Sequence, residues 1–219
     1  MPNHTASPSG PGLPGRRGQA ARNDEAIVAA AREVFLADPK APVSAVAARA
    51  GVGISALYRR YGGKEDLLRQ VCHDGLRRYI AEAEAALEHA DGWAAFTGFL
   101  AAVVDADVHS LTVHLAGSFT PTEEMGADAA RSGELTAELV ARARESGRLR
   151  AGFTAEDVTL VLEGCAAVRF PDPGRTRALR RRYLALVVRG VDAGAEGAAD
   201  LPGPPATAEE LGWRWSRRL

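Results

Sequence analysis

The chain has 219 residues, of which 46% are hydrophobic, 25% charged and 6% aromatic, a composition typical of a soluble globular protein with an alanine-rich, helical interior. No apolar stretch reaches the roughly 20 residues of a membrane span, and the two cysteines are too few for a disulfide framework and lack zinc-ligand spacing, so we expect a cytoplasmic protein with buried thiols. The formal net charge of −1 conceals an asymmetry, because residues 1–64 contain nine Lys or Arg but four Asp or Glu, and such a basic end suits a polyanionic partner.

The N-terminal segment changes character near residue 22. Residues 1–21 are rich in Pro, Gly and Ser, which predicts a disordered basic arm carrying Arg16 and Arg17, with a plain solubility tail as the open alternative. From Asn23 onward, apolar residues recur at helical spacing, and Asn23 or Asp24 is the expected N-cap. The stripe of this first helix consists of Ile27, Ala30, Ala31, Val34 and Phe35.

Two short helices follow it. Pro42 opens a helix of about two turns and Gly51 closes it. The buried stripe of this helix is Val43, Val46, Ala47 and Ala50, and that of the next helix is Ile54, Leu57, Tyr58 and Tyr61. The tight sequence "GVG" between them predicts a helix-turn-helix unit, in which Ser55, Ala56, Arg59 and Arg60 face outward.

The remainder of the chain also has helical periodicity. A long helix is expected over residues 64–88, and further helices over about 92–106, 108–118, 122–146, 154–170 and 174–193, with no competing strand pattern. We therefore predict an all-α protein with an N-terminal helix-turn-helix domain at 22–68 and a helical regulatory and dimerisation domain at 69–194. Residues 195–219 are expected to form a flexible linker and a tail that contains tryptophan.

The outward face of the third helix has the chemistry of a DNA reader. With Leu57 and Tyr61 packed inward, Arg59 can reach base edges in a major groove, where a bidentate contact with guanine contributes ~1–3 kcal/mol of discrimination. Arg60, Tyr58 and Lys64 are placed to contact phosphates and so to set the register. A solvated helix face is the alternative, but it does not explain why small residues, a tight turn and cations share one side.

The segment "VSAVAARAGVGISALYRRYGGKEDLL" resembles the tetracycline-repressor (TetR) family of bacterial transcriptional regulators. The resemblance implies DNA contacts by Ser55, Ala56, Tyr58, Arg59, Arg60 and Lys64, and a larger C-terminal domain that binds ligand and dimerises. The chain has Pro42 and Gly53 where many members carry a hydroxyl residue, and Ser44 is a candidate replacement for one of those contacts. The arm residues Arg16 and Arg17, together with Ser44 and Gly53, complete the candidate DNA-binding set.

Other polar and aromatic residues in the body give weaker indications of a metal, catalytic or ligand site. Asp105 and His109 are four residues apart and His114 is near, but a metal would need further ligands, so we expect no metal and no cofactor. Cys165 lies in an apolar helix without a neighbouring histidine. The helix that contains "RTRALRRRY" is expected to bury an apolar stripe and to turn the arginines of this segment to solvent. The stripe is formed by Leu179, Tyr183, Leu186, Val187 and Gly190. Aromatic residues at helical spacing are more often core than pocket, and with that alternative open the candidate ligand-lining residues are Trp93, Phe96, Phe99, His109, His114, Phe119, Met125, Cys165 and Phe170.

These features predict a sequence-specific DNA-binding regulator. With the resemblance, the leading hypothesis is a homodimeric repressor that a small molecule releases from a palindromic operator. The alternative is a DNA-binding regulator without such a ligand, which uses its body for dimerisation or for a protein partner. An enzyme is not expected, because the chain has no Gly-rich phosphate loop, Ser/His/Asp set or paired-carboxylate motif.

Overall fold

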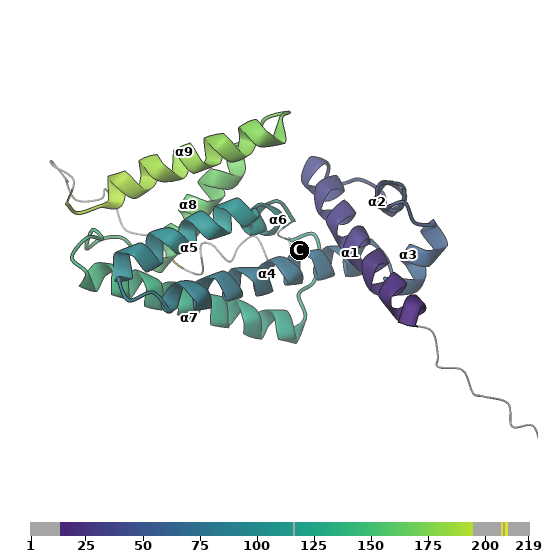
Figure 1. The fold of residues 1–219 in the computed structure, drawn as a ribbon, viewed down its shortest axis with the longest axis horizontal. Helices are drawn as coiled ribbons and strands as arrows, with labels where there is room; N and C mark the ends of the chain where they lie inside the picture. The colour runs from purple at the N-terminus through teal and green to yellow at the C-terminus, as the bar shows by residue number, and fades with distance from the viewer. Residues whose placement is uncertain (1–13, 116, 195–206, 208, 210–219) are drawn as a thin grey trace, which may run out of the picture.

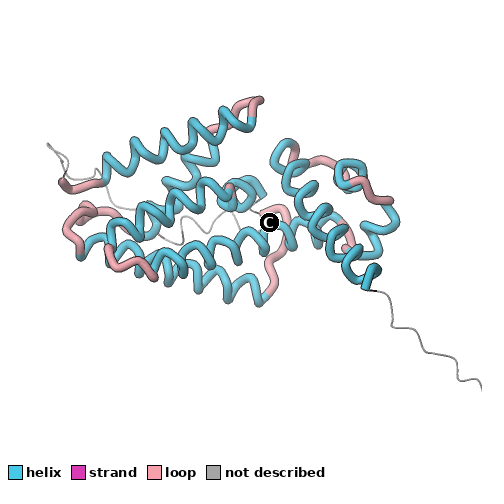
Figure 2. The backbone as a smooth tube through the Cα atoms, in the orientation of Figure 1, coloured by secondary structure: helices cyan, strands magenta, loops and turns pink. Residues whose placement is uncertain are grey.

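The computed structural model describes residues 14–115, 117–194, 207 and 209, and within these ranges the chain is helical without strands (Figure 1). An isolated bridge pairs Leu149 with Asp192. Short loops connect the helices (Figure 2). None of the helices in the described ranges combines the length and apolarity that a membrane span needs.

Three helices form the front unit: α1 (Pro14–Ala37), α2 (Val43–Ala50) and α3 (Ile54–Arg60). They group at one end of the molecule (Figure 1). The expected start of the first helix at Asn23 was wrong, because α1 begins at Pro14 and the backbone of residues 14–21 is helical. Asp24 therefore lies inside the helix, and its carboxylate binds Arg60 of α3 and does not cap α1.

The turn between α2 and α3 forms as the sequence indicated. Gly51 ends α2 in the left-handed region, at φ 68° and ψ 28°, where a residue without Cβ carries no strain. The backbone N–H of Val52 donates to Ala47 at 3.0 Å and closes the turn. This turn fixes the orientation of α3 relative to α2.

The long helix α4 (Lys64–Leu87) runs from the front unit into the body. Its first half, including Leu67, Leu68 and Val71, packs with α1–α3, and its second half packs with the body through Ala83. The front core also takes in Phe119 and Met125 and the C-terminal part of α6, so the two hydrophobic clusters meet along α4 and α6.

The body consists of α5 (Gly92–Ala106), α6 (Val108–Leu115), α7 (Glu123–Glu145), α8 (Ala155–Ala167) and α9 (Pro173–Val191). Side chains of Asp91, Thr122 and Asp172 cap the first turns of α5, α7 and α9. The expected ends at residues 118 and 170 were too late, since α6 ends at Leu115 and α8 at Ala167.

Helix α9 faces the body differently from the expectation. Arg180, Leu184 and Val191 are its buried residues, whereas Tyr183 is 37% exposed and Leu186 58% exposed. The predicted burial of the stripe containing Tyr183 and Leu186 was therefore wrong within this chain. An arginine expected on the wet side, Arg180, is instead turned inward. Tyr183 and Leu186 lie on the outer face of α9, whereas Leu179 and Val187 of the same stripe are half-buried.

Candidate nucleic-acid interface and ligand cavity

Helix α3 presents its polar side to solvent. Leu57 is fully buried and Tyr61 is buried, while Ser55 and Arg59 are exposed. Ile54, at 39% exposure, does not belong to the buried stripe as the sequence suggested. Tyr58 does not belong to it either, at 53% exposure, and it stands beside the two arginines. The outward face therefore combines small residues, a tyrosine hydroxyl and guanidinium groups.

The three cations of this face have different surroundings. Arg59 has no side-chain partner among the described residues. Arg60 donates through Nε to both carboxylate oxygens of Asp24, at 3.0 and 2.9 Å, and this hydrogen bond raises the pKa of Arg60. Lys64 donates to the carbonyl of Pro39 at 2.8 Å and lies over the Phe35 ring. Arg59 is thus free to bind, whereas Arg60 and Lys64 must exchange an intramolecular contact for a phosphate.

The remaining candidate DNA-contacting residues lie around α3. Ser44 is exposed in the first turn of α2, and Gly53 is the exposed residue that precedes α3. Ala56 is half-buried on the same turn as Ser55. Arg16 and Arg17 belong to α1, but their side chains lie outside the described part of the structure.

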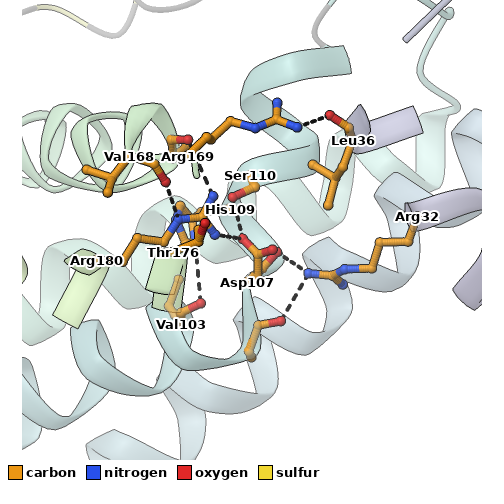
Figure 3. Close-up of polar contacts among 12 residues, drawn as sticks. Arg32, Leu36, Val103, Asp107, His109, Ser110, Val168, Arg169, Thr176 and Arg180 are labelled. Carbon is orange, nitrogen blue, oxygen red and sulfur yellow. Dashed lines mark hydrogen bonds and ion pairs between the residues drawn. The ribbon is translucent and has the colours of Figure 1, made fainter. Parts of the chain in front are cut away.

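A polar network joins the front unit to the body (Figure 3). Arg32 of α1 donates to the backbone oxygens of Ala106, at 3.0 Å, and of Asp107, at the junction of α5 and α6. Asp107 has a positive φ of 53°, and its carboxylate accepts a 2.5 Å hydrogen bond from Arg180 of α9. Arg169 adds a second link by donating to the backbone oxygen of Leu36 in α1. The front unit is therefore attached to the α5–α6 junction and to the segment between α8 and α9.

A cleft of about 540 Å³ lies beside this network, between α1–α2 and the body. Phe170, one of the predicted ligand-lining residues, lines it and is 52% exposed. Residues of the network were missed by sequence reasoning, because they come from segments about 75 positions apart and none of them belongs to a motif. The one indication in the sequence is the position of Asp107, a charged residue between the helices expected over about 92–106 and 108–118.

A smaller cavity of about 190 Å³, partly open to the surface, lies between helices of the body and is bordered by His109. Its lining comes from four helices and consists of Gly75, Leu76, Tyr79, Val108, His109, Ser132, Thr159 and Leu162. His109 is buried, and its Nδ1 is 3.3 Å from the carbonyl oxygen of Val103. Burial lowers the pKa of His109 to about 4, so the imidazole is neutral at physiological pH. Its Nε2 has no hydrogen-bond partner among the described residues.

Most of the other predicted ligand-lining residues are packed in the core. Phe96 contacts Trp93 and Phe153 with ring centroids 6.0 and 5.8 Å apart, and Phe99 contacts Tyr79 edge-on at 5.0 Å. Residues placed inside a hydrophobic cluster are Trp93, Phe96, Phe99, Phe119, Met125 and Cys165. The side chain of His114 lies outside the described part of the structure. A ligand would reach these core side chains only by separating packed helices.

The thiols and the pair Asp105–His109 have local structural roles. Burial raises the pKa of Cys165 to about 11 and that of Cys72 to about 12, so both stay protonated. The carboxylate of Asp105, in α5, binds Arg181 at 2.5 Å, whereas His109 lies in α6. No metal-binding group of three or more residues exists among the residues that the structure describes.

Comparison with known proteins covers both parts of the chain. Residues 27–71 match a family model described as bacterial regulatory proteins, tetR family. Residues 91–193 match a model described as the C-terminal domain of SbtR-like transcriptional regulators. No curated protein matches the chain.

Solved structures share the fold over most of its length. PfmR from Thermus thermophilus, a TetR family transcriptional regulator, superposes with a TM-score of 0.59 at 25% identity, covering 74% of this chain and 97% of PfmR. LfrR from Mycobacterium smegmatis, solved with proflavine, gives 0.57 at 23% identity over 83% and 99% of the two chains. FadR from Bacillus subtilis, solved with stearoyl-CoA, gives 0.54 at 16% identity over 77% and 99%.

Proposed function

Since this chain belongs to the TetR family of bacterial transcriptional regulators, we propose that it is a homodimeric repressor that a small molecule releases from a palindromic operator. In this proposal residues 22–68 bind DNA, residues 69–194 dimerise and bind the ligand, and the protein has no catalytic activity. Like other regulators of the family, it would act in the cytoplasm, where its DNA lies.

The observation that carries the proposal is the outward face of α3. Arg59 is exposed and has no partner among the described residues, and it stands one turn from Ser55 on a helix that Leu57 and Tyr61 fix to the front core. A short helix held in this way enters a major groove with its side chains directed at base edges, while flanking cations meet phosphates. Arg59 is therefore proposed as the base reader, and Arg60, Lys64 and Tyr58 as phosphate contacts.

The proposed homodimer is supported by the outer surface of α8 and α9. Leu160, Tyr183 and Leu186 are 43%, 37% and 58% exposed, although all three are large apolar or aromatic side chains. An apolar stripe on the outside of two neighbouring helices is suited to pack against its own copy across a two-fold axis. To read a palindrome in successive major grooves, such a dimer must hold its α3 helices ~34–36 Å apart.

The His109 cavity and the network at Asp107 together support release by a ligand. His109 and Asp107 are two residues apart at the start of α6, so a molecule that displaces His109 also strains the junction that Arg32 holds. LfrR with proflavine and FadR with stearoyl-CoA show that proteins of this fold accept ligands. An open cavity also favours this proposal over the alternative of a ligand-free regulator, which a sealed, fully packed body would have favoured.

Binding of the full-length protein to DNA flanking its own gene tests the proposed function. We expect a shifted complex with two protein chains per site, specific against scrambled DNA, and a loss of preference at one base position in Arg59→Ala. An Arg59→Ala variant that loses affinity equally for all sequences would refute the base-reading role. A protein that binds no duplex more tightly than scrambled DNA would refute the regulator.

A further inference from the structure

We propose that the cavity at His109 takes a small, uncharged molecule with an apolar body and one hydrogen-bond donor, such as a phenol or a cyclic alcohol. The proposal rests on the proposed function in treating this cavity as the regulatory site. It adds the chemical class of the ligand, which follows from three properties of the lining: its unused hydrogen-bonding capacity, its charge and its size.

The histidine offers an acceptor and no donor. The carbonyl oxygen of Val103 can only accept a hydrogen bond, so Nδ1 of His109 carries the proton and donates it. In a neutral imidazole the other nitrogen then bears a lone pair. This Nε2 belongs to a side chain that is 94% buried, since 6% of His109 is exposed, and it has no partner among the described residues. Less than 1 Å² of the Nε2 surface is accessible, so a ligand that donates a hydrogen bond satisfies it when the His109 ring turns toward the cavity.

The hydroxyl groups of Tyr79 and Ser132 in the lining have also used their donors. Thr136 donates to the carbonyl of Ser132 at 2.7 Å, so the 2.8 Å contact between Tyr79 and Thr136 is donated by the tyrosine. Ser132 donates its own hydroxyl to the carbonyl of Ala129 at 2.8 Å. The oxygens of Tyr79 and Ser132 therefore retain lone pairs but no free proton. Thr159, which is exposed, is the lining residue whose hydroxyl can still turn either way.

The cavity favours an uncharged occupant. No lining residue is charged among those that the structure describes, and Leu76, Val108 and Leu162 supply apolar surface. The charged groups that act on His109 are Asp107, Arg180 and Arg32, and Asp107 is already held by both arginines through its side chain and backbone. An ionised ligand would lose part of its hydration here without gaining a counter-charge.

The cavity volume corresponds to about one ring. An engineered apolar cavity of ~150 Å³ binds benzene, so 190 Å³ accommodates a six-membered ring with a hydroxyl and one or two further carbon atoms. Long acyl chains and fused polycyclic molecules exceed this volume, so they would extend out of the cavity or separate α4, α6 and α8. Phenol and cyclohexanol are therefore suitable probes, and anisole is a matched probe because it keeps the ring and the oxygen but has no donor.

Calorimetric titration of the full-length protein with phenol, cyclohexanol, anisole and benzoate tests the proposal without DNA. We expect phenol to bind about tenfold more tightly than anisole, the effect of one buried hydrogen bond, and benzoate to bind more weakly than phenol. His109→Leu should abolish the preference for phenol over anisole, and His109→Gln, which keeps an acceptor, should retain part of it. His89→Leu, at an exposed histidine outside the cavity, is the matched control and should keep the full preference.

Three outcomes would overturn this proposal: anisole binding as tightly as phenol, benzoate binding most tightly, or no binding of phenol or cyclohexanol up to their solubility limits. The wild-type comparison decides the question even if His109→Leu does not fold. Failure here is separate from failure of the proposed function. A protein that binds its operator but not phenol loses only the ligand class, while one that binds phenol but no DNA keeps the ligand class and loses the regulator.

Discussion

Asp24→Asn is expected to strengthen DNA binding by releasing Arg60. In the free protein the Asp24 carboxylate holds the Nε edge of Arg60, and a further contact joins its Nη2 to the same carboxylate at 2.9 Å. To contact a phosphate, Arg60 must exchange one anion for another. Asparagine keeps the size of the side chain but removes the charge that competes with DNA.

The expected gain follows from the exposure of the pair. The side chain of Arg60 is 62% exposed and that of Asp24 30% exposed, so their interaction belongs to the surface class, which contributes ~0.2–1 kcal/mol. The bidentate geometry places the Asp24–Arg60 interaction near the upper end of this range. Since 1.4 kcal/mol corresponds to a factor of ten, the dissociation constant should fall about threefold to fivefold for each protomer bound through release of its Arg60.

Fluorescence anisotropy with a labelled duplex at several salt concentrations measures this change. Glu25→Gln is the control, because Glu25 is the next residue of α1, is exposed and has no side-chain partner among the described residues, so the variant removes an equal charge without touching Arg60. The gain should disappear when Arg60→Ala is combined with Asp24→Asn, and Arg60→Ala should reduce the salt slope by ~0.9 for each protomer bound. A gain equal to that of Glu25→Gln, or one that persists without Arg60, would refute the reasoning.

Three further predictions concern other parts of the molecule. Arg59→Ala should cost ~1–3 kcal/mol at one operator position, whereas Lys64→Ala should weaken all sequences alike, and binding to singly substituted operators distinguishes the two. Leu186→Glu, at an exposed apolar position of α9, should convert the dimer to a monomer of unchanged helicity in sedimentation velocity, and a persisting dimer would contradict the assigned interface. Because the pKa of His109 is lowered to about 4 from 6.5, the unfolded chain binds a proton between these values that the folded chain does not, so stability should fall as pH falls through this window, by on the order of 3 kcal/mol in total. Urea unfolding at pH 7 and 4.5 should show a smaller pH effect in His109→Gln, and an equal effect would contradict the assignment.

Helical periodicity predicted the front unit well because its information is local. The turn at Gly51 and the inward positions of Leu57 and Tyr61 follow from spacing and from glycine geometry, and the structure confirms them. The start of α1 was missed because Pro and Gly near residue 14 favour an irregular arm, yet proline is tolerated in the first turn of a helix.

Burial on α9 was mispredicted for a different reason. Periodicity identifies an apolar stripe, but it does not say whether the stripe packs on the chain's own core or on another chain. The stripe with Tyr183 and Leu186 faces outward, and the inward face instead contains Arg180, whose partner Asp107 lies 73 positions earlier. Pairings of this kind depend on the tertiary fold, so single-sequence reasoning had no access to them.

The cavity was only partly accessible from the sequence. His109 was a candidate because it lies four residues from Asp105 and near His114. Aromatic side chains at helical spacing are more often core than lining, and Trp93, Phe96 and Phe99 proved to be core. Tyr79 and Ser132, which border the cavity, carry no signal beyond helical spacing. Which helices separate enough to leave a cavity is decided by packing.

The links between the front unit and the body have a consequence for sequence divergence. Arg32 and Arg169 both hold main-chain oxygens, those of Ala106, Asp107 and Leu36, which every amino acid supplies. Replacing Ala106 or Leu36 leaves these acceptors in place, whereas a shift of the main chain withdraws them. The contacts between the front unit and the body can therefore tolerate substitutions at these positions. They still respond to a small displacement of the main chain at the α5–α6 junction.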